Sequence, residues 1–204
     1  MAQNPTELGA LNEEAPRAAI FLDRDRTLIE DPGYIDDPRK VRLLPGVSDA
    51  LRTLRGASYR LVIATNQSGV ARGRVTEEAL TAIHDRLRAL LSVEGADVDA
   101  IYYCPFLEGP AAVVERYRRA SDLRKPGSGM LHRAAGDLNL DLAGSWMIGD
   151  SARDIIAGRA AGCRTILLTA SPDDPDSRES RPDFTAADLV EAANIVIRQD
   201  GADR

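Results

Sequence analysis

Short apolar runs alternate with helix-patterned segments along most of the chain, and this alternation constrains the fold more than any other feature. Runs typical of buried strands cover residues 18–22, 60–64, 98–104, 145–148 and 163–168. Apolar residues at helical spacing follow in segments 47–54, 76–91, 129–138, 152–161 and 186–197. Strands separated by helices form βαβ units, so the pattern predicts a doubly wound α/β fold, a mostly parallel sheet in a three-layer α/β/α sandwich.

The 204 residues suit one domain, which we expect to span 18–199. The preceding segment, 1–17, carries three glutamates and no apolar stretch, which predicts a loosely ordered tail, and 199–204 has a similar composition. The polar, proline-bearing stretch 171–182 predicts a surface loop.

Charge and cysteine content exclude several classes of protein. There are 26 basic and 32 acidic residues, a net charge of −6, which argues against general nucleic-acid binding. The longest apolar runs are far too short to cross a bilayer, so no membrane role is expected. Two cysteines, Cys104 and Cys163, are too few for disulfide bonds to stabilise a chain of this size. Because a low cysteine content is typical of reducing compartments, we expect a cytoplasmic protein.

Polar residues that can do chemistry follow the predicted strands at four places. They are Asp23 and Asp25 after the first strand, Thr65-Asn66-Gln67-Ser68 after the second, Arg124-Lys125 at the end of the long connection 105–128, and Asp150 after the fourth, with Asp154 one turn later. Ligands bind beyond the carboxyl ends of parallel strands, so these residues are expected to meet at one edge of the sheet.

This set of residues suits phosphoryl transfer through an aspartyl phosphate. A carboxylate such as Asp23 can attack phosphorus and divide hydrolysis into two easier steps. Asp23 and Asp150 are hard oxygen ligands suited to Mg²⁺. Thr65 and Lys125 can stabilise the phosphoryl oxygens, and Asp25 can protonate the leaving oxygen and later deprotonate water.

The segments DRDRT, TNQSG, RKP and GDSARD resemble the four motifs of the haloacid dehalogenase superfamily. Together with LLPGV, IYYCP and RKPGSGML, they resemble the D-glycero-D-manno-heptose 1,7-bisphosphate phosphatase group, which includes histidinol-phosphate phosphatases. The resemblance covers about residues 18–170 and implies the haloacid dehalogenase-like sandwich with a minimal cap.

The resemblance implies a Mg²⁺-dependent phosphoric monoester hydrolase with Asp23 as nucleophile and Asp25 as general acid/base. The metal ligands it implies are Asp23, Asp150 and the backbone carbonyl of Asp25. The substrate contacts it implies are Asp31, Pro32, Gly33, Tyr34, Thr65, Asn66, Gln67, Ser68, Arg124 and Lys125. The first candidate substrate is D-glycero-D-manno-heptose 1,7-bisphosphate at its C7 phosphate, and the alternative is histidinol phosphate; the enzyme is expected to be a monomer.

The chain departs from the group at Arg26, where relatives have glycine, and in the long loop. If the backbone is extended at Arg26, strand alternation places both arginines of DRDRT opposite Asp23, Asp25 and Thr27. Many relatives hold zinc with Cys-Pro-His and Cys-x-Cys, where this chain has Cys104-Pro105-Phe106 and Ser121-Asp122-Leu123. One thiolate does not make a tetrahedral site, so zinc is predicted to be absent.

Three questions stay open at the level of sequence. Asp154 can either stabilise the N-terminus of its helix or support the catalytic residues, and the sequence favours neither role. Loop residues Arg116, Arg118, Arg119 and Arg124 favour a second anionic group on the substrate, with Tyr102, Tyr103 and Phe106 expected to hold the loop. The rival functions are a phospho-accepting receiver domain and a degenerate, non-catalytic phosphate-binding module.

Overall fold

Six parallel strands form one sheet in the computed structural model, which describes residues 15–171 and 175–202. In chain order the strands are β1 (Arg17–Leu22), β2 (Arg60–Asn66), β3 (Ala100–Cys104), β4 (Leu140–Gly149), β5 (Arg164–Leu168) and β6 (Phe184–Ala186). Their spatial order is β3-β2-β1-β4-β5-β6, and every pair is parallel.

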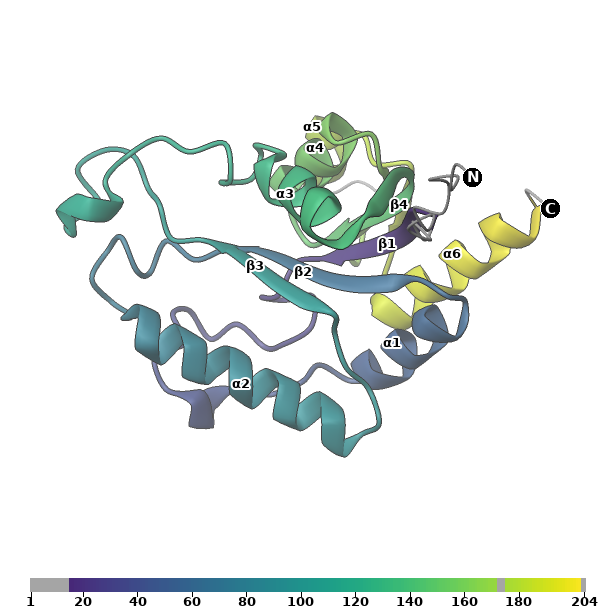
Figure 1. Cartoon of the computed structure of the whole chain (residues 1–204), viewed down its shortest axis with the longest axis horizontal. Helices are drawn as coiled ribbons and strands as arrows, with labels where there is room; N and C mark the ends of the chain where they lie inside the picture. The colour runs from purple at the N-terminus through teal and green to yellow at the C-terminus, as the bar shows by residue number, and fades with distance from the viewer. Residues whose placement is uncertain (1–14, 172–174, 203–204) are drawn as a thin grey trace, which may run out of the picture.

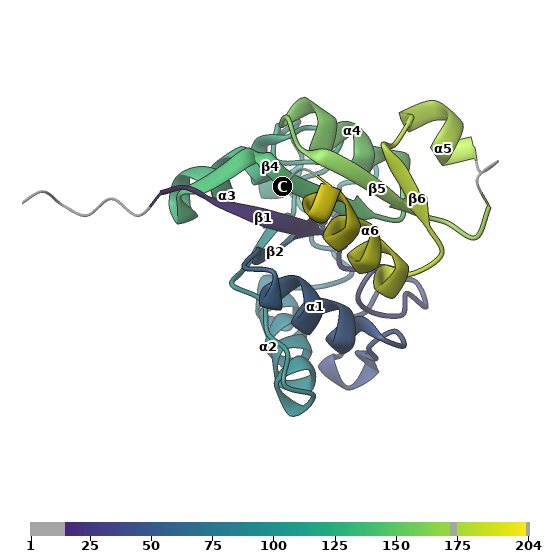
Figure 2. The same ribbon diagram turned by 90° about the vertical axis from the view of Figure 1, so that its right-hand side faces the viewer.

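Helices cover both faces of this sheet (Figures 1 and 2). One face carries α1 (Val47–Gly56), α2 (Glu77–Val93) and α6 (Leu189–Ala202), and the other carries α3 (Gly129–Leu138), α4 (Ala152–Ala160) and α5 (Pro175–Ser180). Two short 3₁₀ turns, η1 (Pro38–Lys40) and η2 (Glu115–Tyr117), lie in the connections. The three-layer α/β/α sandwich predicted from the sequence is confirmed.

The apolar core lies on both faces of the central strands. In β1, Ile20 and Leu22 pack into the larger cluster beneath α1, α2 and α6, and Ala19 and Phe21 pack into a smaller cluster with α3. Side chains alternate across a strand, so a strand buried on both faces is continuously apolar. The two clusters fix β1 and β4 at the centre of the sheet, where the site residues follow them.

The C-terminal third differs from the sequence expectation. Helix α5 begins inside the stretch predicted as a loop, and β6 was not predicted, because three residues are too few to show strand periodicity. Asp183 fixes β6 beside β5, since its Oδ2 accepts hydrogen bonds from the backbone N (2.8 Å) and Oγ1 (2.7 Å) of Thr165.

The first strand and the last helix also differ from their predicted bounds. Strand β1 starts at Arg17, and α6 starts at Leu189 and runs to Ala202, so residues 199–202 are helical. Most of the predicted N-terminal tail, residues 1–14, lies outside the described residues.

The strand order places the winding reversal between β1 and β4. From β1 the chain winds outward through β2 and β3, and it then returns to β4 and winds the other way. The crevice at such a reversal is where ligands bind in open parallel sheets. Within residues 15–171 and 175–202, no helix is both long and apolar enough to cross a membrane.

Candidate active site

Lys125 is buried at the centre of the crevice and joins two of the strand ends. Its Nζ donates to Asp23 Oδ1 (2.7 Å), just beyond β1, and lies 2.6 Å from Asp154 Oδ1, in the first turn of α4. Burial opposes the ammonium charge, but Asp154 and Asp23 outweigh this cost and raise the pKa of Lys125. The predicted meeting of Asp23 and Lys125 is therefore observed.

Asp154 supports both its helix and the site, which resolves the question that the sequence left open. Its Oδ2 accepts hydrogen bonds from Ser151 N (3.0 Å) and Ser151 Oγ (2.9 Å), which caps α4, and its Oδ1 holds Lys125. A Cβ on Gly149 would lie 2.4 Å from Asp154 Oδ2, so glycine is required there for this carboxylate to approach.

Three carboxylates gather where the sequence predicts Mg²⁺. Oxygens of Asp23, Asp150 and Asp154 lie within 4.8 Å of one another. Burial, together with the charges of Asp23 and Asp154, raises the pKa of Asp150 to about 7. Its buried Oδ2 accepts no well-aligned hydrogen bond from the described residues, although Arg26 Nε lies 2.7 Å away. The three clustered hard oxygens fit a Mg²⁺ ion. Ligation by the backbone carbonyl of Asp25 stays a prediction.

Arg26 adopts a left-handed backbone conformation with φ of 58°, so the expected strand alternation is wrong at this residue. Its side chain is 61% exposed, and its Nε lies 2.7 Å from Asp150 Oδ2. Arg24 instead is buried and contacts Asp25. The two arginines therefore do not share one side of the segment. A left-handed conformation favours glycine, the residue that the family resemblance implies at this position.

Asp25 is held from two sides. The guanidinium of Arg24 donates to both of its oxygens, and Gln67 Nε2 donates to its Oδ2 (3.0 Å) and to Thr65 Oγ1 (3.1 Å). Burial raises the pKa of Asp25, opposed by Arg24 and reinforced by Asp23. A carboxyl group with a raised pKa suits an acid/base role.

Asn66 has a role that its sequence motif did not indicate. Its Nδ2 donates to the carbonyl of Lys125 (2.9 Å), and its Oδ1 accepts from the backbone N of Lys125 (3.0 Å). Both polar atoms of the amide are therefore used to fix the backbone of Lys125. The structure assigns Asn66 a positioning function between β2 and the long loop.

A cavity of about 360 Å³ opens onto these groups. The predicted residues that line it are Asp23, Asp25, Asp31, Gly33, Tyr34, Asn66, Gln67, Ser68, Arg124, Lys125 and Asp150. Pro32 and Thr65 are not among the lining residues; Thr65 is only 1% exposed and lies behind Gln67, where it can act through that side chain. The lining also includes Arg72 and Arg153, which the sequence analysis missed because neither stands in a motif's catalytic position.

Three guanidinium groups gather at the cavity wall. The pKa of half-buried Arg124 is lowered by burial and by the nearby charges of Arg153 and Arg72. Arg72 Nε is buried without a hydrogen-bond partner among the described residues. Clustered cations with an unsatisfied donor suit a bound anion, because charge-assisted hydrogen bonds to a phosphate would satisfy them. We call Arg72, Arg124 and Arg153 the arginine cluster.

The loop arginines predicted to favour a second anion are placed differently, except Arg124. Arg116 lies over the ring of Tyr117 (4.6 Å), and Arg119 lies over Phe106 (3.9 Å). Arg118 pairs with Glu115 and donates to the carbonyl of Ala112. The loop uses these three side chains for its own packing and none of them lines the cavity, so their role toward a second anion stays a prediction.

Tyr117 is the main anchor of the long loop. It is buried, its ring packs against Phe106 at 6.1 Å, and its hydroxyl donates to Glu77 Oε2 (2.5 Å). Tyr103 donates to the other oxygen of Glu77, whereas Tyr102 bonds Asp137 of α3. Of the three aromatics expected to hold the loop, Phe106 and Tyr103 take part in this arrangement. The absence of zinc stays a prediction.

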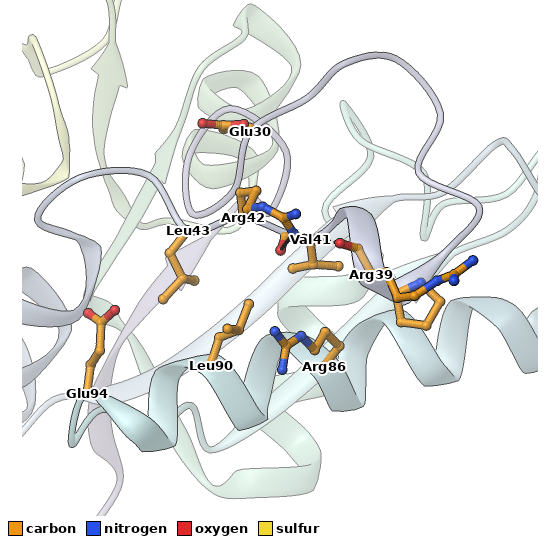
Figure 3. Close-up of a pocket in the computed structure, with 9 residues that line it drawn as sticks. Glu30, Arg39, Val41, Arg42, Leu43, Arg86, Leu90 and Glu94 are labelled. Atoms are coloured by element: carbon orange, nitrogen blue, oxygen red, sulfur yellow. Dashed lines mark hydrogen bonds between the residues drawn. The ribbon is translucent and has the colours of Figure 1, made fainter.

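A second, larger hollow of about 680 Å³ lies between α2 and the loop around η1 (Figure 3). Its lining includes Arg39, Arg42, Arg86, Glu30 and Glu94, together with Leu43 of the loop and Leu90 of α2, which point toward each other. None of the predicted site residues lines it. The catalytic groups belong to the smaller cavity at the carboxyl ends of β1 and β4.

Comparison with known proteins agrees with this geometry. The HAD-hydrolase-like family model matches residues 122–192. A D-glycero-D-manno-heptose-1,7-bisphosphate 7-phosphatase from Thermosynechococcus vestitus is 42% identical over 188 residues, which cover 89% of this chain and 96% of that protein. The D-glycero-β-D-manno-heptose-1,7-bisphosphate 7-phosphatase of Escherichia coli K12 is 37% identical, covering 89% and 94%.

A solved structure shares the fold. The D,D-heptose 1,7-bisphosphate phosphatase from B. bronchiseptica, complexed with magnesium and phosphate, superposes with a TM-score of 0.73 at 33% identity and covers 89% of this chain and 99% of that chain. Sequence, fold and site therefore agree: the chain belongs to the D-glycero-D-manno-heptose-1,7-bisphosphate 7-phosphatase family of haloacid dehalogenase-like hydrolases and is a phosphoric monoester hydrolase.

Proposed function

We propose that this enzyme removes the C7 phosphate from D-glycero-D-manno-heptose 1,7-bisphosphate. The observation that carries the choice of a bisphosphate is the arginine cluster beside the catalytic carboxylates. The reacting phosphate would lie between Asp23 and Lys125, and the second phosphate would satisfy the guanidinium groups of the cluster. The names of the curated relatives support the same substrate.

The reaction divides into two balanced steps. Asp23 attacks phosphorus, the bond from phosphorus to the sugar oxygen breaks, and Asp25 transfers its proton to that oxygen. Water then attacks the aspartyl phosphate, Asp25 takes up a proton from this water, and the bond to Asp23 breaks to release inorganic phosphate. Asp25 ends protonated, as it began.

The surrounding groups stabilise charge during both steps. Lys125, fixed by Asp23, Asp154 and the amide of Asn66, places one positive charge at the phosphoryl oxygens. Mg²⁺, when held by Asp23 and Asp150, supplies the charge that offsets repulsion between these carboxylates and the phosphate. Thr65 acts through Gln67, which it contacts.

The arginine cluster disfavours the alternative substrate, histidinol phosphate. An amino-alcohol phosphate carries an ammonium group close to its phosphate, and this group would lie near three guanidinium groups. Like charges in a partly buried site repel strongly. We also propose that the enzyme acts as a monomer, because all residues of the site come from one chain.

The test compares kcat/KM for the sugar bisphosphate and for the matching monophosphate at fixed ionic strength. Charge-assisted hydrogen bonds contribute about 1.5–3 kcal/mol, so we expect the bisphosphate to be preferred about 10- to 100-fold. Arg124→Ala should shrink this preference, whereas the control Arg116→Ala should not, since Arg116 stacks on Tyr117 outside the cavity. Equal values in the wild-type enzyme, or a preference for histidinol phosphate, would reject the assignment.

A second measurement tests the chemistry itself. Asp23→Asn should lose nearly all turnover while the fold is retained, because the substitution removes the nucleophile. Turnover of a good substrate by this variant at the wild-type rate would exclude covalent catalysis by Asp23.

A further inference from the structure

Arg24 is a buried arginine that the mechanism above does not use. It lies between the nucleophile and the general acid/base in sequence, and only 2% of its surface is exposed. Its Nε donates to Asp25 Oδ1 (2.9 Å) and its Nη2 donates to Asp25 Oδ2 (3.0 Å). Two parallel hydrogen bonds of this kind fix the plane of a carboxylate as well as its position.

The other edge of the guanidinium contacts His84 of α2. Arg24 Nη1 lies 3.2 Å from His84 Nε2. A guanidinium can only donate, so this ring nitrogen accepts and the imidazole is neutral. Burial and the charges of Arg24 and Arg88 lower the pKa of His84 to about 3, which agrees with a neutral ring. The ring packs against Tyr103 at 5.8 Å, and Tyr103 donates to Glu77.

We propose that Arg24 and His84 form a positioning pair that fixes the Asp25 carboxylate at the leaving oxygen of the substrate. The proposal rests on the assignment of Asp25 as general acid/base in the proposed function. Gln67 fixes only Oδ2, so without Arg24 the carboxylate can turn about its own bond. Proton transfer tolerates little misplacement, and small displacements of a catalytic group cause large losses of rate.

His84 in turn determines where Arg24 lies. The arginine side chain is long and flexible, and its free edge would lack an acceptor if the imidazole were absent. An unsatisfied buried guanidinium donor is costly, so the side chain would move to find another partner. The neutral imidazole thus links α2 to the catalytic segment after β1 without adding a charge to the site.

The leaving group of the substrate distinguishes positioning from a merely structural role. An alkoxide leaves only with a proton, whereas p-nitrophenolate leaves without one. The quantity to compare is kcat/KM, which reports steps up to departure of the leaving group. We expect Arg24→Met to lower kcat/KM about 100-fold for the sugar phosphate, the size of a typical general acid contribution, and only a few-fold for p-nitrophenyl phosphate.

Matched variants complete the experiment. Arg86→Met makes the same substitution at an exposed position of α2 outside the site and should leave both values unchanged. His84→Leu should cause a smaller selective loss, about tenfold, and His84→Gln should restore most of it because its amide oxygen can accept from Arg24. Arg24→Lys keeps the charge but not the two-point contact, so it should show the same selectivity if Arg24→Met does not fold.

Asp25→Asn serves as the reference for the test. If Asp25→Asn shows the selective loss and the Arg24 variants lower kcat/KM equally for both substrates, Arg24 is structural and the inference is overturned. If Asp25→Asn itself lowers both values equally, the acid/base role of Asp25 fails and the positioning role fails with it. The positioning pair is supported if the Asp25 and Arg24 variants lower kcat/KM selectively for the sugar phosphate and if His84→Gln restores most of what His84→Leu loses.

Discussion

Replacing Asp154 by asparagine removes a charge and one acceptor from the centre of the site while keeping the shape of the side chain. In the wild-type enzyme, Oδ1 holds Lys125 Nζ at 2.6 Å and Oδ2 accepts from the backbone and hydroxyl of Ser151. Both Lys125 Nζ and Ser151 N can only donate. An amide has a single acceptor oxygen, so its NH₂ group must face one of these donors.

The magnitude follows from the burial of these groups. Asp154 and Lys125 are 1% and 2% exposed. Leaving a buried donor unsatisfied costs about 1–3 kcal/mol, and breaking a buried ion pair costs about 3–5 kcal/mol when no other partner remains. Lys125 keeps Asp23 as a partner, and loss of the Asp154 charge relieves repulsion at Asp150. We therefore expect a net loss of about 2–3 kcal/mol, or roughly 4–12 °C in Tm.

The assay pairs thermal and urea unfolding with turnover. Ser151→Ala is the control, because it removes one hydrogen bond to Oδ2, costs about 1 kcal/mol and leaves the ion pair intact. Asp154→Asn should also lower kcat more than tenfold, since Lys125 loses one of its two carboxylate partners. An unfolding free energy within about 0.5 kcal/mol of wild type, together with an unchanged kcat, would refute this account of Asp154.

Three further predictions follow from other parts of the structure. The pKa of His84 is about 3 in the folded enzyme against an ordinary 6.5, so between these values the unfolded chain binds one more proton and the stability of the fold decreases as the pH falls. The His84→Leu variant lacks this proton-binding group. Urea unfolding should therefore show that it gains stability relative to the wild type when the pH is lowered from 7 to 4. Tyr117→Phe removes the hydrogen bond to Glu77, so it should cost about 1 kcal/mol and speed amide exchange in 105–121, and unchanged exchange would contradict the anchoring role. EDTA should abolish activity and Mg²⁺ restore it, and one zinc per chain after dialysis would contradict the predicted absence of zinc.

The parts of the site that lie at strand ends could be predicted from sequence because topology brings them together. Asp23 and Asp150 are far apart in the chain, yet a parallel sheet places the ends of β1 and β4 side by side. Any chain with this alternation of elements must do the same. The proximity of Asp23 and Asp150 therefore follows from the alternation of strands and helices.

The arginine cluster could not be predicted in this way. Arg72 stands in the turn region after β2, and Arg153 stands in the first turn of α4, where an exposed arginine is ordinary. Local composition instead favoured Arg116 and Arg119, which the loop turns toward its own aromatic rings. Charge counted along a loop does not say which way each side chain points, because packing within the loop decides that direction.

The backbone angle of Arg26 determines which residues its side chain contacts. Alternation along an extended segment would place it beside Arg24, but its φ of 58° turns it toward Asp150. A left-handed conformation costs a non-glycine residue roughly 1–2 kcal/mol. The ion pair with Asp150 offsets only part of this cost, because the arginine is mostly exposed and such pairs contribute about 0–1 kcal/mol. The left-handed arginine is thus a modest loss of stability while Asp23 and Asp25 keep their contacts, and its Nε holds Asp150 Oδ2, an oxygen of a predicted metal ligand.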